Sequence, residues 1–113
     1  MNKLRVNGRI WLETVSDTGS ERFMGIGRLE LLQHIQRTGS INQAAKAMRM
    51  SYKRAWELVQ SMNAQTDTPM VITQTGGDRG GGATVTPEGE KYLALFQALQ
   101  GKFQQFLEQE SLF

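Results

Sequence analysis

The chain has 113 residues and no cysteine, and its 13 Lys/Arg and 11 Asp/Glu leave a formal net charge of +2. This length favours a single domain over residues 1–113. The lack of cysteine excludes disulfides and thiolate chemistry, which fits a reducing cytosol. We see no signal peptide and no apolar run long enough to span a membrane, so we expect a cytoplasmic protein with no membrane partner.

The charges are unevenly distributed along the chain. Residues 1–54 hold ten Lys/Arg against four Asp/Glu, whereas residues 55–113 hold three against seven. Such asymmetry is common, but it suits a protein that contacts a polyanion with part of its surface.

The N-terminal segment predicts a strand over about residues 9–14, because apolar residues there partly alternate with polar ones. Asn7-Gly8 has the composition of a two-residue hairpin turn, which leaves room for a shorter strand before it. Residues 16–20 are expected to form a loop by composition. The apolar positions of the segment are Leu4, Val6, Ile10, Leu12 and Val15.

A helix is expected over about residues 28–38, entered through Phe23–Gly27. Gly39 is well suited to end it, because glycine readily takes the left-handed conformation that follows a helix. His34 lies in this helix without a neighbouring Asp, Glu or Cys cluster, so a surface or boundary position is expected rather than a metal site. The apolar face comprises Leu29, Leu31, Leu32 and Ile35.

Residues 40–63 predict two short helices joined by a tight turn. Ser40 is an N-cap candidate, and Gln43 three residues later completes a capping box. Ser51 offers a second N-cap at the start of the following helix, which should end near Ala64. Small or apolar residues recur at helical spacing at Ala44, Ala45 and Met48, and again at Ala55, Leu58, Val59 and Met62.

The first turn of that second helix carries Tyr52, Lys53 and Arg54, off the apolar stripe. Cations there oppose the helix dipole, so Lys53 and Arg54 are placed for a partner rather than for helix stability. An ordinary helical hairpin is the commoner structure, but these features together are those of a helix-turn-helix. Trp56 and Trp11 are expected in the core or in helix-orienting contacts, not as base-stacking platforms.

After a turn at residues 65–69, two short strands are expected over 70–74 and 83–86. They flank a glycine-rich loop, so residues 70–86 predict a β-hairpin wing. The loop lacks the GxxxxGK[ST] and GxGxxG spacings and joins strands, which argues against a nucleotide site. Arg79 supplies positive charge at the tip, and its glycine neighbours, Gly80 and Gly81, allow close approach to a sugar-phosphate backbone. The alternative is simply a mobile hairpin tip.

The last helix is predicted over residues 87–109. Thr86 caps it, Pro87 takes its first position, and Glu88 and Glu90 complement the positive end of its dipole. Its apolar positions extend beyond what one compact domain needs, so we expect a homodimer through this helix. They are Leu93, Phe96, Leu99, Phe103, Phe106 and Leu107, with Leu112 and Phe113 beyond.

These motifs resemble the N-terminal DNA-binding domain of ModE-type, molybdate-dependent transcriptional regulators, which is similar to the winged helix of LysR-type regulators. The resemblance runs from about Gly8 to the last helix. The Ser-Tyr-x-x-Ala-Trp and Gly-Gly-x-x-Gly-Gly-Gly pair is its most specific part. The matching stretches are Arg28–Leu32, Gly39–Ala45, Ser51–Trp56, Gly76–Gly82 and Val85–Gly89.

The resemblance implies a dimer on a palindromic operator, with residues 51–54 in the major groove and Arg79 with its glycines as the wing. There are two departures. Full-length family members carry C-terminal molybdate-binding domains for which this chain has no room, so molybdate sensing is not carried over to this stand-alone form or fragment. Arg49 also occupies a turn region that is often glycine, which implies another turn geometry or a small strain.

The expected fold is therefore mainly α with a small β component, a winged helix-turn-helix with a long C-terminal helix. The expected partner is double-stranded DNA, bound sequence-specifically by a transcriptional regulator. No nucleophile, base and orienter coincide, so no enzyme, metal or cofactor is expected. The alternatives are a protein-interaction module that has lost DNA binding and, ranked low, oxyanion binding by the glycine-rich loop. The candidate DNA-binding residues are Gln43, Lys46, Arg49, Ser51, Tyr52, Lys53, Arg54, Arg79, Gly80 and Gly81.

Overall fold

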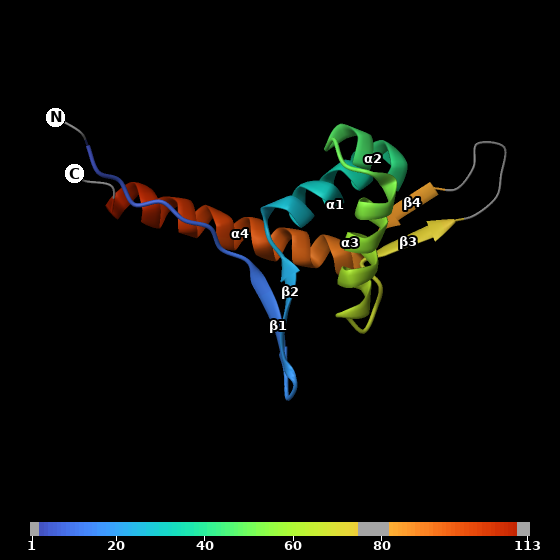
Figure 1. The fold of residues 1–113 in the computed structure, drawn as a ribbon, viewed down its shortest axis with the longest axis horizontal. Helices are drawn as coiled ribbons and strands as arrows, with labels where there is room; N and C mark the ends of the chain where they lie inside the picture. Colours follow the sequence, from blue (N-terminus) through green and yellow to red (C-terminus); the bar gives the residue numbers. More distant parts are fainter. Residues whose placement is uncertain (1–2, 75–81, 111–113) are drawn as a thin grey trace.

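The computed structural model describes residues 3–74 and 82–110, and it confirms a mainly helical fold with two small antiparallel sheets (Figure 1). Three helices pack together beside the two hairpins, and a long fourth helix runs along one side. The elements, in chain order, are β1 (Leu12–Ser16), β2 (Gly19–Met24), α1 (Ile26–Thr38), α2 (Ile41–Ala47), α3 (Tyr52–Ala64), β3 (Val71–Gln74), β4 (Gly82–Val85) and α4 (Pro87–Glu110).

The N-terminal hairpin differs from the one expected. β1 pairs with β2, and Ser16 lies opposite Gly19, so the turn is Asp17-Thr18 rather than Asn7-Gly8. The loop expected over residues 16–20 contains this turn but is shorter than predicted, because Ser16, Gly19 and Ser20 belong to the strands. Gly19 has φ of +138°, a conformation that side-chain-bearing residues rarely adopt, which suits it to leave this turn.

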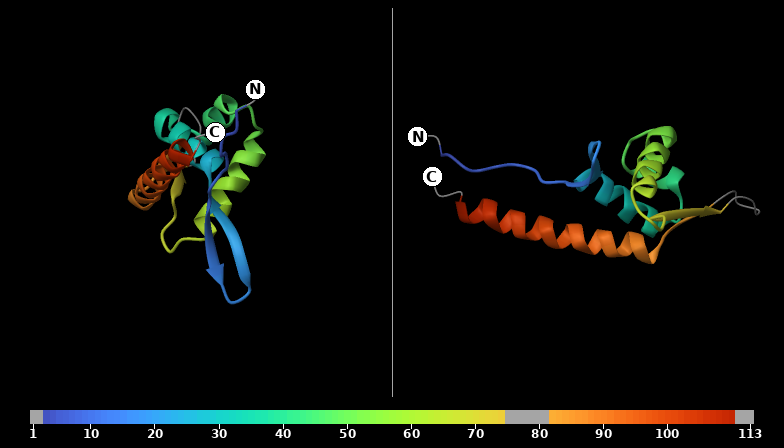
Figure 2. Two further views of the ribbon diagram at one scale, coloured as in Figure 1. Left: turned by 90° about the vertical axis from the view of Figure 1, so that its left-hand side faces the viewer. Right: turned by 90° about the horizontal axis from the view of Figure 1, so that it is seen from below.

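The segment before β1 forms no strand and instead runs beside the C-terminal half of α4 (Figure 2). A methyl group added to Gly8 would lie 3.3 Å from Phe103 Cζ, which measures how close the two segments come. The strand predicted from residue 9 therefore begins later. Residues 9–11 are unpaired in the sheet, and β1 pairs with β2 only from Leu12 onward.

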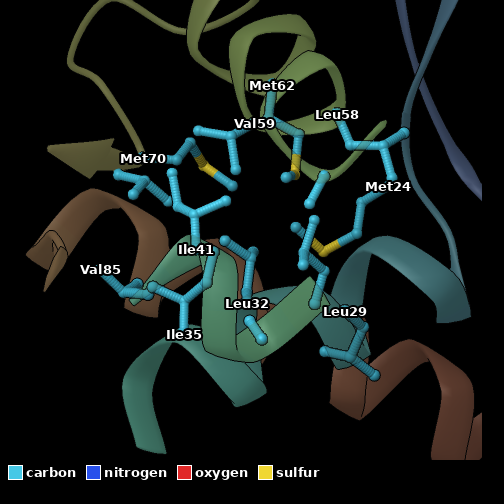
Figure 3. Packing of buried hydrophobic residues seen from close by; sticks show 14 of the residues in the cluster. Met24, Leu29, Leu32, Ile35, Ile41, Leu58, Val59, Met62, Met70 and Val85 are labelled. Carbon is cyan, nitrogen blue, oxygen red and sulfur yellow. The ribbon is translucent and has the colours of Figure 1, made fainter. Parts of the chain in front are cut away.

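The core lies between α1, α2 and α3, and β3, β4 and α4 close it (Figure 3). Gly39 ends α1 with φ of +68°, and its amide donates to Ile35 O at 2.8 Å, as expected of the residue after a helix. α1 begins at Ile26, slightly earlier than predicted. Residues with under 2% exposed surface include Met24, Leu31, Leu32, Ile35, Val59, Met62, Met70 and Phe96.

The caps of the two central helices are largely those predicted. Ser40 Oγ accepts the Gln43 amide at 3.1 Å, and Ser51 Oγ accepts the Arg54 amide at 3.0 Å. The amide of Ser40 donates to Thr38 Oγ1 at 3.3 Å. The reciprocal part of the capping box is thus taken by the preceding threonine, and the Gln43 side chain is exposed.

The second hairpin is tied to the helices by backbone hydrogen bonds. Val71 pairs with Val85, and the Ala83 amide donates to Gly39 O at 2.9 Å. Asn63, near the end of α3, accepts the amides of Met70 and Val71 at 2.8 and 3.1 Å. Its Nδ2 donates to Val71 O at 2.9 Å.

α4 leaves this hairpin at a tightly packed corner. Thr86 Oγ1 accepts the Gly89 amide at 3.1 Å, which confirms Thr86 as the cap. A methyl group at Gly89 would lie 2.5 Å from Met70 O, so only glycine lets the helix approach β3 this closely. The helix then continues for 24 residues, about 36 Å at 1.5 Å per residue. The molecule is therefore elongated, with principal extents of 60, 37 and 22 Å.

Candidate nucleic-acid interface

α3 presents a polar and aromatic face on the side away from the core. Its buried stripe is Ala55, Leu58, Val59 and Met62, as predicted. Lys53 is exposed on the other side, and the side chains of Tyr52 and Trp56 are 51% and 44% exposed. Tyr52 and Trp56 are four residues apart and therefore neighbours on the helix surface.

Trp56 and Trp11 are each 44% exposed, so the core half of the expectation is wrong for both, and the orienting contact remains a prediction. The position of Trp56 relative to the apolar residues of α3 could have predicted its exposure. At about 3.6 residues per turn, Trp56 stands roughly a quarter-turn from Ala55, off the buried stripe. An exposed tryptophan beside Lys53 adds an apolar surface able to contact a thymine methyl group or a sugar.

The turn between α2 and α3 is closed without glycine. Arg49 has φ of +57°, which confirms the strain expected there and costs roughly 1–3 kcal/mol for a residue with a side chain. The amides of Arg49 and Met50 donate to Lys46 O and Ala45 O at 3.1 and 3.0 Å. These bonds hold the turn tight, and they leave the Arg49 side chain exposed.

The remaining candidates divide between two flanks of α3. Gln43 and Lys46 are exposed on α2, three residues apart and so on one face. Arg54 turns the other way and lines a pocket beside β2 and α1. The structure thus groups Lys53 with Tyr52 and Trp56 on the exposed face of α3, whereas Arg54 lies on the flank of α3 that faces β2 and α1.

The wing has described strands and an undescribed tip. β3 and β4 form the antiparallel hairpin that the sequence predicts. Arg79, Gly80 and Gly81 lie outside the described residues, so the role of the tip remains the prediction made from its sequence.

A helix–turn–helix followed by a two-stranded hairpin defines the winged helix-turn-helix class of proteins. Residues 26–90 match the family model described as "Bacterial regulatory helix-turn-helix protein, lysR family". The match covers more than half of the sequence, and the chain belongs to this family.

Curated relatives confirm the resemblance to ModE-type regulators. The chain is 37% identical over 111 residues to the molybdenum transport protein ModE of Azotobacter vinelandii, covering 98% of this chain and 40% of the relative. It is 48% identical over 77 residues to the molybdenum-pterin-binding protein MopB of Rhodobacter capsulatus, covering 68% and 28%. It is 42% identical over 72 residues to the DNA-binding transcriptional dual regulator ModE of Escherichia coli K12, covering 64% and 28%.

The chain thus spans less than half the length of these relatives. Within residues 3–74 and 82–110, no helix has both the length and the apolar character needed to cross a membrane.

Proposed function

We propose that the protein binds duplex DNA sequence-specifically, as a transcriptional regulator of the ModE type. The observation that carries the proposal is the exposed face of α3, where Lys53 lies beside the half-exposed Tyr52 and Trp56. A helix of this kind fits the major groove, where lysine prefers guanine edges and apolar rings contact thymine methyl groups. The DNA-binding relative in Escherichia coli supports the same assignment.

Phosphate contacts would hold α3 in register on both sides. On the α2 side, Gln43, Lys46 and Arg49 are exposed close to the turn. Ser51 Oγ accepts the Arg54 amide, and its own hydrogen is available to donate to a phosphate oxygen. On the hairpin side, the contact would come from Arg79, Gly80 and Gly81. Such contacts fix position and orientation, while the start of α3 reads bases.

A homodimer would pair through α4. Its C-terminal half extends past the domain core, where the Phe103 and Phe106 rings stack with centroids 6.3 Å apart. Leu95 and Phe106 are 45% and 50% exposed. A second copy covering these side chains would bury apolar area and place two α3 helices on one operator.

The test begins with enrichment of duplexes from fragmented genomic DNA of the source organism. A palindromic consensus is the expected result, and a dimeric mass by light scattering should accompany it. If the enriched sites lie beside molybdenum-related genes, this protein would share the link to molybdenum that its relatives' names state. Uniform recovery would contradict sequence-specific binding. No recovery at all would return the protein-docking alternative to first place.

The reading role of α3 is tested on the selected duplex with Lys53→Gln. We expect a loss of about 1–3 kcal/mol of binding free energy and a relaxed preference at one base position. Lys3→Gln is the matched control, because it removes the same charge from an exposed residue of the N-terminal segment, which runs beside α4 and away from α3 (Figure 2). Equal affinity of both variants would remove Lys53 from the interface.

A further inference from the structure

Four arginines that are scattered in the sequence line one pocket beside α3. The pocket has a volume of about 550 Å³, within the range of small-ligand sites. Each arginine comes from a different part of the fold: the segment before β1, then β2, α1 and α3. They are Arg9, Arg22, Arg28 and Arg54.

Two carboxylates lie near this group of arginines, Glu13 opposite Arg22 on the first hairpin and Glu21 beside Arg28, but neither forms an ion pair with a described arginine. Across the described ranges, none of the four forms an ion pair, and Arg28 Nη1 donates instead to three neutral oxygens. These are Arg22 O, Phe23 O and Ser61 Oγ, at 3.0 to 3.1 Å. Burial, then the charges of Arg54 and Arg22, lower the pKa of Arg28, and Glu21 opposes them as the smallest contribution. Because guanidinium groups stay protonated, the repulsion between them persists.

The remaining walls add a helix terminus and apolar surface. Gly25, the N-cap of the 13-residue α1, supplies no side-chain cap, and Ile26 and Gly27 of its first turn line the pocket. The positive end of the α1 dipole therefore adds to the arginine charge. Arg22 lies over the Trp11 ring at 4.3 Å, which orients its guanidinium at the apolar wall. Met50 and Leu58 complete that wall.

We propose that this pocket binds a phosphate ester, with the phosphate among the arginines and the organic part against Trp11 and Met50. Guanidinium groups match the geometry of phosphate oxygens, and an anion would relieve the repulsion between the arginines. The volume is larger than a lone oxyanion needs, which favours an ester.

The ester has two possible sources, a sugar-phosphate of the DNA backbone or a small phosphorylated molecule. Arg54 and Leu58 connect the pocket to α3, on the flank away from Asn63 and the β3–β4 hairpin. A major groove that holds α3 is bordered by two backbones. The hairpin would meet one backbone, and the arginine pocket would hold the other. This DNA source rests on the proposed function, whereas the small-molecule source does not.

Two exposed arginines permit a direct test, with Arg9→Gln and Arg22→Gln as variants and Lys3→Gln as the charge-matched control. First, 2-deoxyribose 5-phosphate is titrated while amide NMR signals are followed. An ester site of either source predicts saturable shifts at Gly25, Ile26 and Gly27 that either pocket variant abolishes, and shifts without the slope change described next assign the small-molecule source. Thermal melting of each variant verifies that it is folded.

Second, duplex affinity is measured over a range of salt concentrations. For a DNA source, each pocket variant should lower the slope of log K against log salt by about 0.9, the value for one lost phosphate contact. The control variant should keep the wild-type slope. Absence of both the NMR shifts and the slope change overturns the proposal. A wild-type protein that binds no duplex defeats the proposed function, while the NMR titration still decides whether the pocket binds an ester.

Discussion

The two hairpins of the molecule have the same secondary structure but different anchoring. β3–β4 is bonded to the helices at its base, through Ala83 to Gly39 and through Asn63 to Met70 and Val71. β1–β2 projects from the domain, with Phe23 and Met24 at its base in the core (Figure 1), and Gln65 at the end of α3 bonds Thr14 and the Arg22 carbonyl. The β3–β4 hairpin is thus anchored by buried side chains as well as backbone hydrogen bonds, whereas most of the first hairpin is anchored by polar contacts to α3.

The largest effect should come from the corner that joins β4 to α4. Gly89→Ala places a methyl group 2.5 Å from Met70 O, a backbone atom that cannot rotate away. We expect a loss of about 3 kcal/mol in the free energy of unfolding, measured by urea denaturation, as for other overpacked sites.

Gly101→Ala is the control within the same helix, because nothing lies within 4 Å of its added methyl group. It should stabilise the protein by about 0.5–1 kcal/mol through helix propensity. Equal stability of the two variants would show that α4 does not pack against β3 as described.

A smaller loss is expected at Asn63, whose side chain makes three hydrogen bonds to the backbone at Met70 and Val71. Asn63→Ala leaves these partly buried groups without partners, which should cost about 2 kcal/mol of stability. Because the hairpin then loosens next to α3, affinity for the selected duplex should fall too. Loss of stability with unchanged affinity would separate the hairpin from DNA binding.

The smallest effect belongs to the first hairpin. Val15 on β1 is 81% exposed, so Val15→Thr should change the unfolding free energy by no more than about 0.5 kcal/mol. Affinity for the duplex should also be unchanged, since Val15 lines neither the α3 face nor the arginine pocket. A clear loss in either measurement would reveal a contact of the first hairpin in the dimer or on DNA.

Sequence reasoning succeeded where the signal is local. Ser40, Ser51 and Thr86 cap the helices predicted for them, and Gly39 ends α1 with positive φ. Caps and glycines act within a few residues, so their consequences can be derived from spacing. The expected strain at Arg49 belongs to the same group, because a tight turn without glycine forces one residue to positive φ.

Sequence reasoning failed where two local patterns compete, and where contacts between segments distant in the chain determine the conformation. Asn7-Gly8 suits a hairpin turn, yet the segment before β1 lies along α4, and the turn forms at Asp17-Thr18. A core position for Trp56 is one of the two expectations, yet its helical phase lies outside the buried stripe and the residue is 44% exposed.

Periodicity, caps and breakers are encoded over a few residues, and they are enough to predict the helix-turn-helix, the wing strands and the long last helix. The course of the N-terminal segment depends on tertiary packing, and so does the position of Arg54, which lies with three distant arginines and not with its neighbour Lys53. The physical reason is that a pocket depends on how helices and hairpins pack. Packing brings together residues whose separation in the chain carries no periodic signal.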